Sequence, residues 1–85
     1  MAALRELVGR YDEVGEFRNH GAARALEGIL AVVDGFEKRG ELQKAVKGMK
    51  SFKGLLDLQK RHGVVSEKAY VDLASGADSL IERWQ

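Results

Sequence analysis

The stretch LQKAVKGMKSFKGLLDLQKR, residues 42–61, decides the fold of this chain. Apolar residues recur in it every three or four positions, which is the spacing of one side of an α-helix. They are Leu42, Ala45, Val46, Met49, Phe52 and Leu56. Glycines at positions 40 and 63 flank the stretch, and glycine readily adopts the positive φ that ends a helix. The pattern therefore predicts a helix over about residues 41–61 with one apolar face that must be covered.

Three further apolar stripes with the same spacing predict the helices that cover this face. These helices span about residues 3–14, 19–39 and 66–84. Their stripes consist of Leu4, Leu7, Val8, Tyr11 and Val14; of Ala22, Leu26, Ile29, Leu30, Val33 and Phe36; and of Tyr70, Leu73, Ala77, Leu80, Ile81 and Trp84. Asn19 and Ser66 are favourable N-caps, because their side-chain oxygens can accept an unpaired backbone N–H. Phe17, in the first turn, is expected to close one end of the helix assembly.

The four segments predict an all-α fold: an antiparallel helical bundle of three long helices plus a shorter N-terminal helix. The connections are short, so consecutive helices should be antiparallel neighbours. Eighty-five residues suffice for one domain, and no repeat or linker divides the chain. We therefore expect residues 1–85 to form a single, monomeric domain.

The composition argues against several classes of function. There is no cysteine, which excludes disulfides and thiolate metal sites. No apolar run reaches the ~18–20 residues of a membrane span, and the first residues lack the hydrophobic stretch of a signal peptide. No serine stands in a nucleophile-elbow context, and no phosphate-binding glycine loop follows a strand. We expect no catalytic residue, no cofactor and no membrane insertion.

Four residues with metal-ligating side chains are expected near one end of the bundle. His20 begins the second predicted helix, His62 follows the third, and Glu13 and Glu16 lie at the end of the first. Antiparallel helices bring these ends together, so the four side chains form a candidate ligand set. Polar residues normally collect at helix ends, and solvated turn residues are the favoured interpretation. We expect no metal, while the sequence leaves open whether the four side chains cluster.

Charge is distributed unevenly along the chain, although the net charge is only +1. Residues 42–62 hold six lysines and arginines against one aspartate, whereas the segments on both sides are net negative. At about 100° per residue the lysines spread over half of the helix circumference, without interleaved aromatic residues, so nucleic acid is not an expected partner. The favoured interpretation is a solvated face that complements acidic neighbours. The alternative is binding of an acidic polymer such as teichoic acid or an anionic polysaccharide, with Lys47 and Lys50 as candidate contacts.

Three hydrophobic residues are further candidates for surface contacts. Leu58 and Val71 lie outside the core stripes of their helices, and they would form a contact with a partner domain if they adjoin. Single exposed apolar residues are common in soluble proteins, which is the competing interpretation. Trp84 fits a core stripe but lies near the end of the chain. It is therefore either part of the core or a candidate for stacking against a sugar.

Several segments taken together resemble the FIMAH domain family. They are LRELV (residues 4–8), EVGEF (13–17), AARAL (22–26), KAVKGMKSF (44–52), VSEKAY (65–70) and the residues Leu80, Ile81 and Trp84. The resemblance covers about residues 4–84. Glu41 departs from the pattern, because a smaller capping residue is expected before the third helix. The resemblance implies a helical accessory module of a larger secreted or cell-surface hydrolase of a Gram-positive bacterium, and it supplies no catalytic or binding motif.

Two classes of function follow from this context, for a module expected to be non-catalytic and extracellular or at the cell surface. In the first, it mediates binding to carbohydrate, cell wall or another extracellular partner, with Lys47, Lys50 and Trp84 as candidate contacts. In the second, it is a structural docking or spacer domain that stabilises its parent enzyme, with Leu58 and Val71 as candidate contacts. The expected partners are the domains of the parent hydrolase and a polysaccharide or cell-wall polymer.

Overall fold

The computed structural model describes all 85 residues and contains four α-helices. Helix α1 spans Ala2–Glu13, α2 spans His20–Lys38, α3 spans Leu42–Arg61 and α4 spans Glu67–Trp84. Each bound differs from its sequence-based prediction by at most one residue. The prediction of an all-α helical bundle with a shorter N-terminal helix is confirmed.

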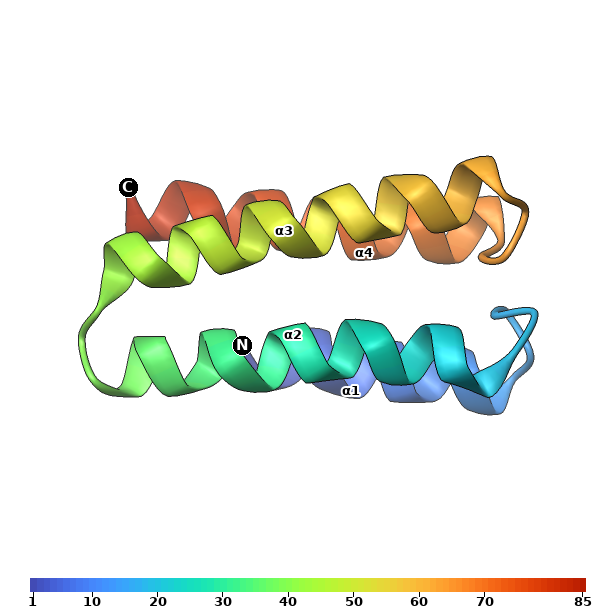
Figure 1. The fold of residues 1–85 in the computed structure, drawn as a ribbon, viewed down its shortest axis with the longest axis horizontal. Coiled ribbons are helices and arrows are strands. Elements are labelled where there is room, and N and C mark those ends of the chain that lie inside the picture. The colour runs from blue at the N-terminus through green and yellow to red at the C-terminus, as the bar shows by residue number, and fades with distance from the viewer.

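The helices form a four-cornered bundle in which each one contacts its two neighbours (Figure 1). Helices α2 and α3 lie in front and α1 and α4 behind in this view. The α2–α3 turn and the C-terminal end of α4 lie at one end of the bundle, and the other two loops lie at the opposite end. Because α1 has only 12 residues, its N-terminus lies part-way along the bundle. The end formed by α2, α3 and α4 is therefore not covered by α1.

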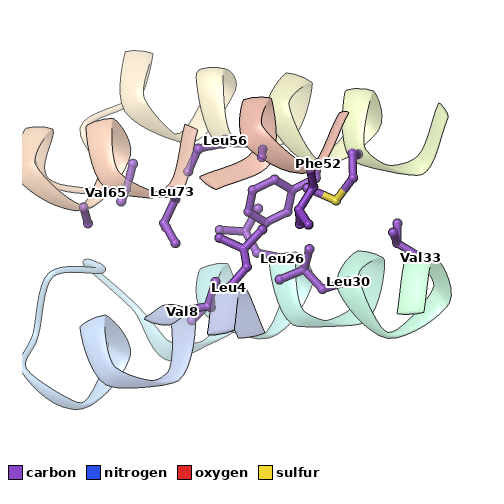
Figure 2. Close-up of a cluster of buried hydrophobic side chains, with 14 of the residues drawn as sticks. Leu4, Val8, Leu26, Leu30, Val33, Phe52, Leu56, Val65 and Leu73 are labelled. Atoms are coloured by element: carbon purple, nitrogen blue, oxygen red, sulfur yellow. The ribbon is translucent and has the colours of Figure 1, made fainter. Parts of the chain in front are cut away.

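Side chains from all four helices meet in one hydrophobic core (Figure 2). The largest fully buried ones are Phe52, Leu26, Leu30, Met49, Leu56, Leu73, Val8 and Val33. Burying a side chain of this size stabilises the fold by about 1.5–3 kcal/mol relative to leaving it exposed. The core therefore accounts for most of the large apolar residues of the predicted stripes.

Two predicted core residues are exposed instead, and the ends of the helices explain both errors. Val14 is 66% exposed because α1 ends at Glu13 and Val14 is its C-cap, after which Gly15 turns the chain with φ +82°. Leu42 is 39% exposed because it is the first residue of α3, at the end of the bundle that α1 does not reach (Figure 1). Periodicity extends a stripe to the last apolar residue, whereas packing stops where neighbouring helices stop.

The two loops at the other end of the bundle are joined to each other. Phe17 is buried and forms an isolated antiparallel bridge with Val65. Phe17 thus closes this end of the bundle, as expected from the sequence. The backbone N–H of Arg18 donates to the carbonyl of Val64 at 2.6 Å, and that of Ser66 donates to the carbonyl of Glu16 at 3.0 Å. This bridge fixes the α1–α2 loop against the α3–α4 loop.

The capping side chains also explain where the helices begin. The Asn19 side chain accepts a hydrogen bond from the backbone N–H of Ala22 at 2.8 Å, and Ser66 Oγ accepts one from that of Ala69 at 3.1 Å. Glu41 occupies the N-cap position of α3 without a side-chain capping bond. Its carboxylate instead binds Arg39 at 2.9 Å and Lys44 at 3.2 Å, so the turn before α3 is stabilised by ion pairs.

Candidate functional site

Lys47, Lys50 and Trp84 line one groove on the surface, between the first half of α3 and the end of α4. The groove has a volume of about 440 Å³, the largest of the five surface hollows. Its remaining lining consists of Gln43, Val46 and Gln85. The structure thus brings together the three residues that the sequence singled out as candidate ligand contacts.

The helical register of α3 explains how these side chains reach the groove. Val46 is buried on the core side, and Lys47 and Lys50 are exposed one turn apart beside it. Trp84, in the last turn of α4, is half-buried and packs against the core. The groove therefore has two basic side chains on one helix and an aromatic ring on the other.

The lysines of α3 divide into paired and unpaired groups. Lys53 binds the carboxylate of Asp78 on α4, and Lys60 lies 4.0 Å from that of Glu67. Lys44 binds Glu41 at 3.2 Å and also lies 5.8 Å from the centre of the Phe36 ring. Cations over aromatic rings at this distance are attracted by the ring face. These three lysines complement neighbouring groups of the domain itself.

Lys47 and Lys50 have no such partner. Neither takes part in an ion pair or a side-chain hydrogen bond, and no acidic side chain lines their groove. The sequence-based interpretation of the basic face as a complement to acidic neighbours thus describes Lys44, Lys53 and Lys60, but it does not describe these two. The side chains that line this groove therefore carry two positive charges and no negative one.

The candidate metal ligands are engaged elsewhere or exposed. His20 Nδ1 pairs with the carboxylate of Asp12, and Glu16 accepts a hydrogen bond from Ser66 Oγ at 2.7 Å. Glu13 and His62 are exposed at the surface. No group of three or more histidine, aspartate or glutamate side chains lies close enough together to hold a metal ion.

Two tyrosines tie helices together through carboxylates. Tyr11 on α1 donates a hydrogen bond to Asp72 on α4, and this bond raises the pKa of the Tyr11 hydroxyl above its ordinary value. Tyr70 on α4 donates to Asp57 on α3 at 2.6 Å, which raises the pKa of Tyr70 in the same way. The ion pairs with Arg39 and then Lys44 lower the pKa of Glu41. These groups lie outside the groove and connect neighbouring elements.

Leu58 and Val71, the candidate contacts for a partner domain, are both exposed, at 42% and 54%. Asp57, Lys53 and Lys60 mark the side of α3 that faces α4. Leu58 lies about 100° beyond Asp57 around the helix, on the outer surface. Leu58 therefore points away from the α3–α4 seam.

Val32 is an exposed apolar residue that the sequence assigned to no face. It lies on α2 and is 56% exposed. The half-buried residues Ile29 and Leu55 pack against the core on the same helices as Val32 and Leu58. Because they stand three residues from the exposed ones, one turn away, they extend the apolar strips along α2 and α3. We call the surface formed by Ile29, Val32, Leu55 and Leu58 the outer α2–α3 face.

Comparison with known families identifies the domain. The FIMAH domain model matches residues 1–82 of the 85-residue chain. The chain belongs to the FIMAH domain family. FIMAH domains are accessory modules, and the four-helix structure agrees with a small accessory domain. No curated protein and no solved structure matches the chain.

The helices of this FIMAH domain are amphipathic. None of the four combines the length and the apolar character that a membrane crossing demands. Their apolar faces are used in the core, and the polar faces carry the ion pairs described above.

Proposed function

We propose that this FIMAH domain is a non-catalytic accessory module that holds a larger extracellular bacterial hydrolase near a carbohydrate or cell-wall polymer. The groove between α3 and α4 is the proposed binding site, and one observation carries the proposal. Lys47 and Lys50 are the unpaired lysines of α3, and both line the same groove as the half-buried ring of Trp84. Charged and aromatic groups that converge without internal partners are typical of a recognition surface.

Retention of the 85-residue domain on insoluble polysaccharides and on purified Gram-positive cell walls tests this proposal. We expect retention at low salt that decreases at high salt, because exposed charge pairs are screened. Replacing Trp84 by alanine, or Lys47 and Lys50 together, should reduce retention. Absence of retention on every polymer at low salt would contradict the proposal.

Several features support a role without catalysis. The interior is filled by the apolar core, and the Ser66 hydroxyl is occupied by the capping bond of α4 and by Glu16. An active site normally needs a nucleophile or base beside an orienting partner in a cleft. Turnover of a glycoside, ester or peptide by the isolated domain, abolished by one substitution, would contradict this part of the proposal.

Docking onto a neighbouring domain of the parent protein is the second candidate function. The observation that favours it is the outer α2–α3 face, where Val32 and Leu58 are both exposed. Exposed apolar surface of this kind is common at interfaces between domains. Under this alternative, deleting the domain lowers the thermal stability of the parent enzyme. The substitution Leu58→Ser in the full-length parent also lowers its thermal stability. Retention on polymers would be absent.

A further inference from the structure

The chemistry of the groove also indicates which class of polymer it takes. Resting on the binding function proposed above, we propose that the groove binds an acidic polysaccharide. In this complex Lys47 and Lys50 contact the carboxylates of the polymer, and Trp84 packs against the face of a sugar ring.

The first argument is charge. Of the five lysines of α3, Lys44, Lys53 and Lys60 are neutralised by carboxylates of the domain. Lys47 and Lys50 are not, and the other lining residues of the groove, Gln43, Val46, Trp84 and Gln85, carry no acidic side chain. Two ammonium groups that form no ion pair within the domain attract an anionic polymer and repel a cationic one. A neutral polymer would leave both without a partner.

The second argument is the spacing of the two lysines. Residues three apart on a helix have Cβ atoms roughly 5–6 Å apart, and both side chains line the same groove. A lysine carries a compact charge on a flexible stem, so two such side chains can follow charges that lie along a chain. The arrangement fits anionic groups that repeat along a polymer.

The third argument is the remaining lining, which fits sugar rings. Trp84 and Val46 supply the apolar part of the groove wall, and Gln43 and Gln85 supply amide groups that donate and accept hydrogen bonds. A sugar ring presents an apolar face and hydroxyl groups, whereas a phosphate chain without rings presents neither to the tryptophan. The groove has a single aromatic residue, unlike nucleic-acid grooves that stack successive bases. An acidic polysaccharide uses every group of the lining.

Three soluble probes separate these possibilities. Polygalacturonate has sugar rings with carboxylates, its methyl ester has the same rings without the charge, and inorganic polyphosphate has the charge without the rings. We expect the 85-residue domain to bind polygalacturonate at low salt, and to bind the methyl ester and polyphosphate more weakly. Affinity electrophoresis or isothermal titration calorimetry measures each binding constant.

A pair of matched double variants tests the role of the two lysines. Lys47→Gln with Lys50→Gln should raise the Kd for polygalacturonate by about tenfold, as the loss of two exposed charge contacts implies. Lys44→Gln with Lys53→Gln removes the same charge from the same helix but leaves the groove intact, so it should change the Kd by less than about twofold. Trp84→Leu should weaken binding of polygalacturonate but leave the weaker binding of polyphosphate unchanged. Circular dichroism of each variant checks that the helices are retained.

The possible failures have different meanings. If the two double variants weaken polygalacturonate binding equally, the groove is not the site and the inference is wrong. If the methyl ester or polyphosphate binds as tightly as polygalacturonate, the proposed ligand class is wrong. If polygalacturonate does not bind while cell walls or neutral polysaccharides retain the domain, the inference fails and the proposed binding function stands. If nothing retains the domain, both fail.

Discussion

A β-carbon at position 48 would lie 2.5 Å from Cγ2 of Val33, so α3 packs against α2 at this point only because Gly48 has no side chain. Val33 is fully buried and branched at its β-carbon, which leaves it little room to move. The relationship gives a reason for a glycine in the middle of a helix, where it otherwise costs about 1 kcal/mol relative to alanine.

Gly48→Ala should therefore destabilise the domain by about 1–3 kcal/mol, as overpacking of a core contact does. Gly54→Ala on the same helix is the matched control, because no atom lies within 4 Å of its added β-carbon. That change should stabilise the domain by about 0.5–1 kcal/mol. Urea denaturation of both variants measures the two changes in the free energy of unfolding. If both substitutions stabilise or both destabilise the domain, the contact between Gly48 and Val33 is wrongly described.

Truncation of the core should be costly in proportion to burial. Leu30→Ala and Phe52→Ala, at fully buried positions, should each lower the free energy of unfolding by about 2–5 kcal/mol. Ile81→Ala should cost less, because Ile81 is only partly buried, and Val14→Ala should be within about 0.5 kcal/mol of neutral. Thermal or urea unfolding, followed by circular dichroism, measures the free energy of unfolding of each variant. A large loss of stability for Val14→Ala would contradict the exposed position of Val14.

Stability should fall at alkaline pH because of Tyr11 and Tyr70. Both pKa values are raised in the folded state by hydrogen bonds to carboxylates. Each tyrosine–carboxylate hydrogen bond therefore stabilises the fold fully below the pKa of tyrosine in the unfolded chain, which is about 10. This stabilisation is lost as the pH rises through the higher pKa of the tyrosine in the folded domain. The double variant Tyr11→Phe with Tyr70→Phe should lose less stability than the wild type above about pH 10. An unchanged pH profile between the two proteins would contradict the prediction.

The bridge between the loops should matter for the whole domain. Phe17→Ala should lower the free energy of unfolding by about 3–5 kcal/mol, because Phe17 is buried and belongs to the common core. Arg18→Ala is the control, since Arg18 is exposed and contributes its backbone N–H to the bridge. Differential scanning calorimetry should show one transition in both variants. A separate low-temperature transition for the loops would show that the bridge is not part of the cooperative fold.

Local features of the sequence were sufficient to predict the helices. The spacing of apolar residues, the caps Asn19 and Ser66 and the turns at Gly15, Gly40 and Gly63 all act within a few residues. The errors arise where packing depends on a neighbour in space. Val14 and Leu42 fit their stripes but have no helix beside them, and Ala23 is buried although it lies outside the stripe predicted for α2.

The candidate site could be predicted only in part, for the same reason. The sequence names Lys47, Lys50 and Trp84 as candidate contacts, but it does not place them in one groove. Which lysines are unpaired depends on the register of α3 against α4, which puts Lys53 beside Asp78 and leaves Lys47 and Lys50 free. The bridge between Phe17 and Val65 and the close contact of Gly48 with Val33 likewise join residues far apart in the chain.

The central claim, that the α3–α4 groove is the binding site, is tested most directly by nuclear magnetic resonance. Amide and indole N–H signals of the ¹⁵N-labelled domain are followed while polygalacturonate oligomers are added at low salt. We expect shifts concentrated at Gln43, Lys47, Lys50 and Gln85 and at the indole of Trp84, with little change at Val32 and Leu58. Shifts centred on the outer α2–α3 face, or no shifts at any oligomer concentration, would contradict the claim.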